Sequence, residues 1–293
     1  MCLPHVRPWH GFVSAPASRF CRRSMLAMAL PALLVLAGGQ AELFAQQPAA
    51  KAAIVPAGHQ VYWLAYSPDG KMVLSVGNSD YVKLWEVALR KERAALRGHN
   101  KEVTRVAFCP DGSKWATGSD DTTVVVWDAA KREELFTLKG HTGVVVGVAF
   151  APDGKTLVTG ADKTVRVWGL ETKKEIAALH LYADVASIAH APDGKTVAIG
   201  TVDGGVSIWD TDEPRKVLPC STKHTNRVRG LAYSPDSKTL ASVSDDGKAV
   251  LREVANGKVL ADFRPSKGVT KCVAFSRDGK TLALGCEDAT MRL

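Results

Sequence analysis

Short apolar stretches separated by polar turns follow one another along residues 52–293, and the second group of them shows the pattern most clearly. Val103–Phe108 and Thr123–Trp127 are largely apolar, Lys114–Gly118 is a further short stretch, and Glu133–Leu138 alternates between polar and apolar positions. Short runs rich in valine and aromatic residues are typical of β-strands, and alternation indicates a half-exposed strand. The pattern therefore predicts four antiparallel strands in each group.

A Pro-Asp-Gly turn, or a close variant of it, marks six copies of this group. Proline presets the backbone φ of such a turn, and glycine accepts the positive φ that follows. The first turn residue recurs every 40 to 43 residues, at Pro68, Pro110, Pro152, Pro192, Pro235 and Arg277. A fixed period of this length is typical of an array of equivalent supersecondary units. One four-stranded sheet cannot bury both of its faces alone, so we expect neighbouring units to cover one another.

Two dipeptides recur with the same period. They are Gly-His at Gly58-His59, Gly98-His99 and Gly140-His141, and Trp-Asp at Trp127-Asp128 and Trp209-Asp210, with relaxed forms at Trp85-Glu86 and Trp168-Gly169. Over about residues 52–293 the chain resembles the WD-repeat β-propeller family. The resemblance implies an all-β fold, a β-propeller of four-stranded antiparallel blades, with six blades visible and seven if the chain is truncated. It also implies that Ala52–Pro56 supplies the outer strand of the sixth blade, because the last repeat stops at Leu293.

The resemblance further implies a buried hydrogen-bond chain of His, Ser or Thr, Asp and Trp within a blade. The candidate residues are His99, Thr117, Asp121 and Trp127 in the second repeat, and His141, Thr159, Asp162 and Trp168 in the third. An ionised Asp can accept from an imidazole and from turn amides, and a buried Trp N–H needs an acceptor. Because the set recurs with the fold period, we interpret it as structural and not as a catalytic triad. Arg252 replaces Trp in the fifth repeat, so we expect the chain only in the second and third.

Residues 1–45 have the pattern of an export leader. Arg22 and Arg23 precede a stretch of thirteen apolar residues, Met25–Ala37, which is shorter than the about 20 residues of a membrane span. The paired arginines also resemble a twin-arginine signal, and cleavage is expected near Ala41 or Ala45. We therefore predict an exported protein, periplasmic or secreted, with no stable membrane span in the mature chain. An uncleaved leader that anchors the chain in a membrane is the alternative.

The leader is followed by a short linker, residues 46–51, and then by the propeller, residues 52–293. The formal net charge is +8, but basic residues are spread over every repeat beside acidic ones, so we do not expect nucleic-acid binding. Cys109, Cys220, Cys272 and Cys286 form no CxxC motif or disulfide framework, although a Cys272–Cys286 bridge is conceivable. No Walker, Rossmann, HExxH or GxSxG motif occurs, so we expect no metal site, no cofactor and no enzymatic activity.

Similarity to WD-repeat proteins implies a scaffold that binds a protein or peptide partner on one face of the ring. The candidate contacts lie at the starts of inner strands and in the turns before each buried Asp: Tyr62, Trp63, Asn78, Lys101, Arg105, Asp120, Tyr182, Arg227, Arg229, Asp245, Lys271 and Glu287. Trp, Tyr and Arg dominate interface hot spots, so Trp63, Tyr182 and Arg229 lead this set. The alternatives are an exported propeller that uses its central channel for a substrate or small ligand, with His190 as a candidate, and a fragment of a larger WD-repeat protein.

Overall fold

The computed structural model describes residues 57–211, 217–220 and 223–293, and the regular elements among them are all strands. The chain divides into two units, Met1–Lys51 and Ala52–Leu293. The expectations for the leader, for the linker and for an outer strand at Ala52–Pro56 fall outside the described residues. Every sheet of the second unit is an antiparallel meander in which consecutive strands pair.

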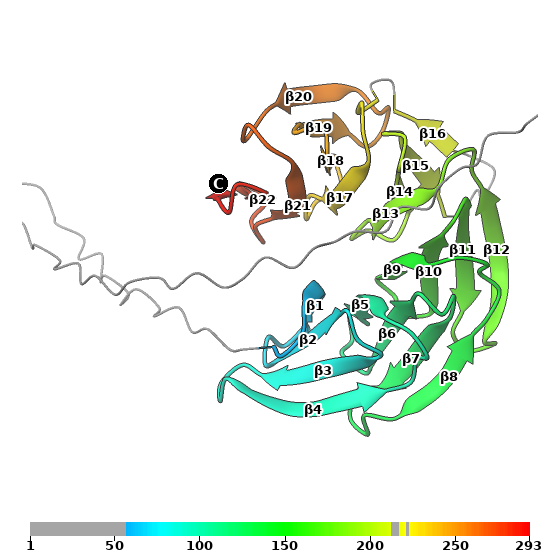
Figure 1. The fold of residues 1–293 in the computed structure, drawn as a ribbon. Coiled ribbons are helices and arrows are strands. Elements are labelled where there is room, and N and C mark those ends of the chain that lie inside the picture. Colours follow the sequence, from blue (N-terminus) through cyan, green and yellow to red (C-terminus); the bar gives the residue numbers. More distant parts are fainter. Residues whose placement is uncertain (1–56, 212–216, 221–222) are drawn as a thin grey trace, which may run out of the picture. The chain divides into compact units, whose positions relative to one another are not determined.

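Each of the first three blades contains four strands (Figure 1). Blade 1 comprises β1 (Val61–Tyr66), β2 (Met72–Gly77), β3 (Tyr81–Glu86) and β4 (Lys91–Arg97). Blade 2 comprises β5 (Val103–Phe108), β6 (Lys114–Ser119), β7 (Val124–Asp128) and β8 (Glu134–Leu138). Blade 3 comprises β9 (Val145–Phe150), β10 (Thr156–Ala161), β11 (Thr164–Gly169) and β12 (Lys174–His180). The four strands predicted from the hydrophobic pattern of the second repeat are thus confirmed, to within a residue at most ends.

The remaining three blades repeat this plan. Blade 4 comprises β13 (Val185–His190), β14 (Thr196–Thr201), β15 (Val206–Asp210) and β16 (Val217–Pro219). Blade 5 comprises β17 (Val228–Tyr233), β18 (Thr239–Ser244), β19 (Ala249–Glu253) and β20 (Val259–Phe263). Blade 6 comprises three strands in its described part, β21 (Thr270–Phe275), β22 (Leu282–Cys286) and β23 (Met291–Arg292). Six successive blades confirm the predicted all-β propeller.

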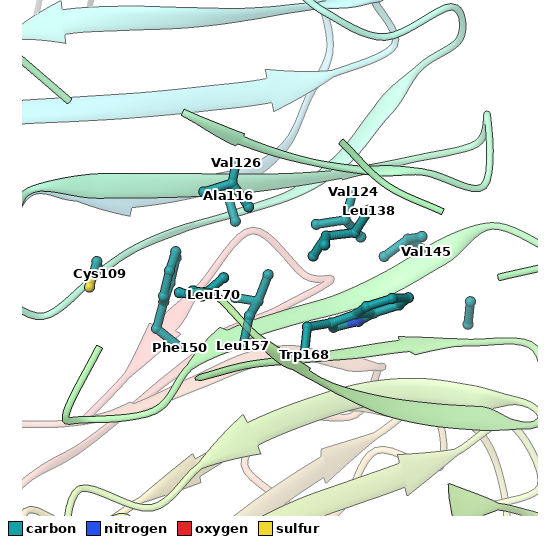
Figure 2. Close-up of a cluster of buried hydrophobic side chains, with 11 residues drawn as sticks. Cys109, Ala116, Val124, Val126, Leu138, Val145, Phe150, Leu157, Trp168 and Leu170 are labelled. Carbon is teal, nitrogen blue, oxygen red and sulfur yellow. The ribbon is translucent and has the colours of Figure 1, made fainter. Parts of the chain in front are cut away.

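The hydrophobic cores lie between blades, as expected for sheets that cannot bury their faces alone. One core joins blade 2 to blade 3, where Val124 and Val126 of β7 pack with Phe150, Leu157 and Trp168 (Figure 2). Similar cores join blades 1 and 2, blades 3 and 4, and blades 4 and 5, and a smaller one joins blades 5 and 6. Burial of this apolar area is the main favourable term in folding. Each blade therefore depends on its neighbours for stability.

Inner strands carry the contacts between successive blades, from β1 to β5 and onward to β21. Each inner strand also has a register shift near its start, typical of a β-bulge, for example between Val103 and Arg105 in β5 and between Val228 and Gly230 in β17. A bulge inserts one extra residue and changes the direction of the side chains beside it. The sequence pattern did not predict these bulges, which determine which side chains face the propeller axis.

One face of blade 1 is more exposed than the equivalent face of blade 2, which packs against the preceding blade. Leu64 in β1 is 55% exposed, whereas Val106, at the same register position in β5, is 2% exposed because blade 1 covers it. Val61 and Tyr66 are exposed as well. The hydrophobic pattern is the same in both strands, so the difference in burial comes from the neighbouring blade.

The Pro-Asp-Gly turns have the expected geometry. Gly112 has a φ of 71°, in the left-handed region that glycine adopts without strain. In the fifth turn Ser237 takes the glycine position with a φ of 59°, and its hydroxyl accepts a hydrogen bond from the Asp193 amide of blade 4. Ser237 therefore gives a contact between blades in a backbone conformation that is unfavourable for most residues.

The four cysteines of the propeller are free thiols. Cys109 and Cys286 are buried, and Cys272 is exposed. A bridge between Cys272 and Cys286 is not formed, and the fold is held by packing and hydrogen bonds instead.

Candidate functional site

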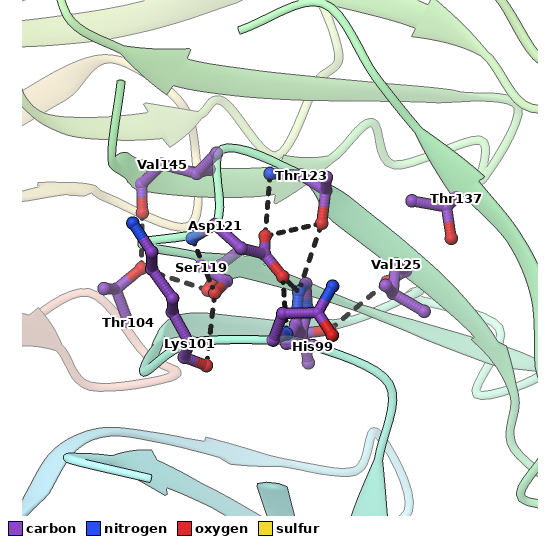
Figure 3. Close-up of polar contacts among 12 residues, drawn as sticks. His99, Lys101, Thr104, Ser119, Asp121, Thr123, Val125, Thr137 and Val145 are labelled. Carbon is purple, nitrogen blue, oxygen red and sulfur yellow. Dashed lines mark hydrogen bonds and ion pairs between the residues drawn. The ribbon is translucent and has the colours of Figure 1, made fainter. Parts of the chain in front are cut away.

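The buried hydrogen-bond chain of blade 2 is complete, and Figure 3 shows its His99 and Asp121. His99 Nε2 lies 2.8 Å from Thr117 Oγ1, and His99 Nδ1 lies 3.0 Å from Asp121 Oδ2. The indole of Trp127 donates to Thr117 Oγ1 at 3.0 Å. Two of the four side chains come from the strands β6 and β7 and two from loops, so the hydrogen-bond chain ties the middle strands of the blade to the loops beside them.

In the hydrogen-bond chain of blade 2, the charge lies on the Asp121 carboxylate. Burial raises the pKa of Asp121, but hydrogen bonds from the Thr123 hydroxyl and from the amides of Asn100 and Thr123 outweigh it and lower that pKa to about 2. Burial lowers the pKa of His99, against the attraction of Asp121. The blade therefore contains an ionised Asp and a neutral His at neutral pH.

A Thr–His–Asp set with these distances has the geometry of a catalytic triad, but its surroundings are those of a structural element. Thr117 is 0% exposed, and its Oγ1 accepts the hydrogen bond of Trp127. A nucleophile must reach a bound substrate, and this hydroxyl is covered on every side. This hydrogen-bond chain therefore contributes to the stability of the fold.

In blade 3 the structure brings together three of the four expected residues. His141 Nε2 and Trp168 Nε1 each lie 2.7 Å from Thr159 Oγ1. Asp162 instead accepts from the Thr142 hydroxyl at 2.7 Å, so the expectation that Asp162 binds the histidine was wrong.

The reason is the length of the turn between β10 and β11. Thr159 and Trp168 are nine residues apart, whereas Thr117 and Trp127 in blade 2 are ten apart. The shorter turn places Asp162 in the first position of a two-residue hairpin, with a φ of 46°. This one-residue difference is visible in the sequence and could have indicated the outcome.

Blade 5 contains a chain that sequence reasoning did not predict. His224 Nδ1 lies 3.0 Å from Asp246 Oδ2, and His224 Nε2 lies 2.9 Å from Ser242 Oγ. Arg252, which replaces the Trp, donates from Nη1 to the same Ser242 oxygen and is 0% exposed. The expectation that only the second and third repeats form the chain was therefore wrong, because a guanidinium N–H can fill the role of the indole N–H.

The other blades contain parts of the chain. In blade 1 the Trp85 indole donates to Ser75 Oγ at 2.8 Å, while His59 Nδ1 lies 3.1 Å from the Ala57 carbonyl oxygen. In blade 4 the Thr201 hydroxyl donates to Asp203 Oδ1 at 2.5 Å. In blade 6 Asp288 Oδ1 accepts from the amide and hydroxyl of Thr290.

Several of the candidate partner-binding residues meet at the propeller axis. The guanidinium carbon of Arg105 lies 4.7 Å from the centre of the Trp63 ring. Arg229 binds Asp245 through two contacts of 2.7 Å, Nε to Oδ1 and Nη2 to Oδ2. Trp63, Arg105 and Arg229 line one cavity of about 50 Å³, to which the inner strands of blades 1 to 5 all contribute. The structure therefore brings these three side chains together.

The remaining candidates form separate contacts around this centre. Tyr62 donates to Glu102 Oε2 at 3.1 Å, and Lys271 Nζ lies 3.2 Å from Glu287 Oε1. Asn78 Oδ1 accepts from the Gln60 amide. Burial and the charge of Glu102 raise the pKa of Asp120. The Lys101 carbonyl oxygen accepts from the Ser119 hydroxyl at 3.4 Å, and Tyr182 is fully exposed. Arg227 is half-buried and comes immediately before β17.

Small residues of blades 3 to 5 complete the axial cavity, and sequence reasoning did not include them. Gly147, Ser187 and Gly230 occupy the register position that Trp63 and Arg105 occupy in blades 1 and 2. Their small size leaves the room into which the larger side chains extend. The signal was present as a position that holds a large residue in two repeats and a small one in three.

Two findings concern other kinds of site. Within residues 57–211, 217–220 and 223–293, no group of three or more His, Cys, Asp or Glu is arranged to hold a metal ion. In the same ranges, no helix is long and apolar enough to cross a membrane.

Six meander blades, Pro-Asp-Gly turns and His–Ser/Thr–Asp chains together define a WD-repeat β-propeller. The family model described as the IFT122 first beta-propeller matches residues 60–293, and the chain therefore belongs to this family of WD-repeat β-propellers.

Curated relatives share parts of the propeller. The Serine-threonine kinase receptor-associated protein of Gallus gallus is 26% identical over 129 residues, 44% of this chain and 36% of its own length. The WD repeat-containing protein 91 homolog of Dictyostelium discoideum is 23% identical over 135 residues, 44% of this chain and 18% of its own length. An uncharacterized WD repeat-containing protein of Synechocystis sp. is 35% identical over 63 residues, 21% of this chain and 18% of its own length. The alignments thus cover 18% to 36% of the length of these relatives.

Proposed function

We propose that this protein is a non-enzymatic interaction scaffold that binds a peptide segment of a partner protein over the axial cavity. The observation that carries the proposal is the meeting of Trp63, Arg105 and Arg229 around that cavity. Trp and Arg are enriched among the residues that contribute most to binding, and such residues cluster near the centre of an interface. WD-repeat propellers commonly bind protein partners, which agrees with this arrangement.

The size of the axial cavity favours a scaffold over a channel that holds a substrate. Pockets for small molecules are usually about 300–1,000 Å³, whereas the axial cavity is about 50 Å³. A peptide needs only one inserted group and can make its other contacts on the surrounding face. The size of the cavity therefore supports peptide binding.

His190, the candidate for an enzymatic alternative, lies away from the axis. It lines a cleft of about 620 Å³ between blades 3 and 4, and its Nδ1 lies 3.1 Å from the Ala191 carbonyl oxygen. A similar cleft of about 390 Å³ lies between blades 1 and 2, where Phe108 takes the place of the histidine. Such clefts accompany the blade architecture, so the cleft beside His190 is weak support for catalysis.

A peptide-display screen against the purified chain tests the scaffold proposal. We expect selected peptides to lose binding on Trp63→Ala or Arg229→Ala substitution. Phe263→Ala and Arg277→Ala are the matched controls, because both residues are exposed and lie on other parts of the surface. Peptides that bind these four variants equally would place the binding surface elsewhere, and a screen that selects no peptide would contradict the proposal.

We also propose that the chain is exported through residues 1–45. The support is the sequence alone: a pair of arginines followed by the apolar stretch Met25–Ala37. N-terminal sequencing of the protein recovered from outside the cytoplasm should begin between about Gln40 and Lys51. Recovery of intact Met1 would contradict cleavage, and substitution of Arg22 and Arg23 by lysine tests the twin-arginine route.

A further inference from the structure

Two arginines, one from blade 2 and one from blade 5, line the same cavity at the propeller axis, and a third lies two residues before the second of them. Arg105 follows the bulge of β5, Arg229 lies at the bulge of β17, and Arg227 comes immediately before that strand. Burial, followed by the positive charges of Arg227 and Arg229, lowers the pKa of Arg105 to about 10. Arg105 and Arg229 line one cavity, so their like charges act on each other there.

Acidic side chains balance this charge only in part. Asp245 forms both of its ion-pair contacts with Arg229. Among the described residues, no carboxylate forms an ion pair with Arg105 or Arg227, and the Arg105 side chain donates instead to the Thr104 carbonyl oxygen. Glu287, which attracts Arg229 from blade 6, is already paired with Lys271. Of these three guanidinium groups, Arg229 is directly bound to a carboxylate, and Arg105 and Arg227 form no ion pair among the described residues.

The cavity beside these arginines has room for one small group. Its volume of about 50 Å³ is a few times the about 10–15 Å³ that a single water needs on this measure. Trp63, Arg105 and Arg229 line this cavity from blades 1, 2 and 5, and the Arg105 guanidinium carbon lies 4.7 Å from the centre of the Trp63 ring. Guanidinium groups bind carboxylates in a planar, two-pronged geometry.

We propose that the axial cavity binds the carboxylate of an acidic peptide, which inserts along the propeller axis between Arg105 and Arg229. This inference rests on the proposed scaffold function and adds the chemistry of the recognised peptide. The inserted carboxylate supplies a negative charge beside Arg105, which has no carboxylate partner among the described residues. The aliphatic part of the inserted side chain packs against Trp63. Residues 46–293 contain 34 basic and 29 acidic residues, and this net charge of +5 favours the approach of acidic partners as well.

The test uses small probes that carry one group each. N-acetyl-aspartate amide represents an internal acidic side chain, N-acetyl-alanine represents a C-terminal carboxylate, and N-acetyl-asparagine amide is the neutral control. Binding is followed by the NMR signals of the arginine Nε–H groups, assigned by loss of the corresponding signal in each Arg→Gln variant. We expect saturable shifts of the Arg105 and Arg229 signals with one or both carboxylates and none with the asparagine probe. Equal responses to all three probes, or no response, would overturn the proposal.

Variants separate the site from general electrostatic attraction. Arg105→Gln and Arg227→Gln should each weaken carboxylate binding by about tenfold, and Arg277→Gln should leave it unchanged. Arg105→Lys keeps the charge but loses the planar donor pair, so it should bind more weakly than the wild type. Thermal melting of each variant checks that the fold is retained, and Arg227→Gln serves if Arg105 variants do not fold. Equal loss in Arg277→Gln would overturn the proposal.

Two further outcomes distinguish this inference from the scaffold function. Display-selected peptides that bind without any acidic residue would overturn the carboxylate site and leave the scaffold intact. Carboxylate probes that shift the arginine signals, combined with a screen that selects no peptide, would contradict the scaffold and leave an anion site. Inorganic phosphate is the final probe. If it displaces the aspartate probe at equal concentration, the site binds free anions, and the assignment to a peptide is overturned.

Discussion

Blade 2 and blade 5 solve the same packing problem with different chemistry. Both have a His that links a hydroxyl to an Asp, with distances that agree within about 0.1 Å. The fourth member is Trp127 in blade 2 and Arg252 in blade 5, and both donate an N–H to the hydroxyl. The position thus accepts either of two long side chains with an N–H donor, and neither an aromatic ring nor neutrality is essential.

Truncation of Trp127 should have the largest effect on stability. We expect Trp127→Ala to lower the free energy of unfolding by about 3–5 kcal/mol, because it creates a cavity in the core between blades 1 and 2. Chemical denaturation followed by circular dichroism measures this change. Tyr182→Ala, at a fully exposed position, is the control and should change stability by less than about 0.5 kcal/mol.

If Arg252 fills the role of the indole in blade 5, its truncation should lower the free energy of unfolding nearly as much as truncation of Trp127 does. We expect a loss of about 2–4 kcal/mol for Arg252→Ala, because the side chain is buried and Ser242 loses its donor. Arg252→Met fills the volume without the charge and should cost clearly less. Losses below about 0.5 kcal/mol for both variants would mean that Arg252 is a tolerated substitution with no structural role.

Acid should destabilise the propeller, and the histidine of blade 3 should contribute most. Burial, followed by the charge of Arg166, lowers the pKa of His141 to about 4 against the attraction of Asp162. In blades 2 and 5 the Asp opposes the lowering of the histidine pKa by a hydrogen bond as well as by its charge. A folded state that resists protonation has its full stability above pH 6.5, the value for an unfolded histidine, and loses it as the pH falls to about 4.

Each such histidine contributes a slope of up to about 1.4 kcal/mol per pH unit in this window. Denaturation midpoints measured between pH 7.5 and 4, together with NMR titration of the histidine C–H signals, follow the effect. His141→Gln should flatten the curve more than His99→Gln does. A pH-independent stability from 7 to 5 would contradict the assignment of neutral buried histidines.

Replacing Asp121 and Asp162 by asparagine compares the complete hydrogen-bond chain of blade 2 with the incomplete one of blade 3. Asp121→Asn removes the ionised acceptor beside His99, and we expect a loss of about 1–2 kcal/mol. Asp162→Asn should cost about 0.5 kcal/mol or less, because in the described part of the chain Asp162 accepts its side-chain hydrogen bond from Thr142 and not from the histidine, and asparagine tolerates its positive φ. Equal losses in paired denaturation experiments would show that the contact of Asp121 with the histidine adds nothing.

The fold was predictable from the sequence because its signals are local and repeated. The apolar runs indicated the strands, the Pro-Asp-Gly turns indicated their connections, and the period indicated the six visible blades. The site was predictable in part. Residue types at matching repeat positions were enough for blade 2, but the shorter turn before Thr164 displaced Asp162, and Arg252 took a role that the family pattern assigns to Trp.

The amino-acid sequence by itself determined the strands, the turns and the requirement that sheets cover one another, since these follow from hydrophobic period and backbone preference. Only the tertiary structure decided which side chains meet at the axis. Arg105 and Arg229 are separated by more than a hundred residues and approach because bulges turn them inward and small residues of blades 3 to 5 leave space. Such contacts depend on the curvature of the whole array, and no local pattern records it.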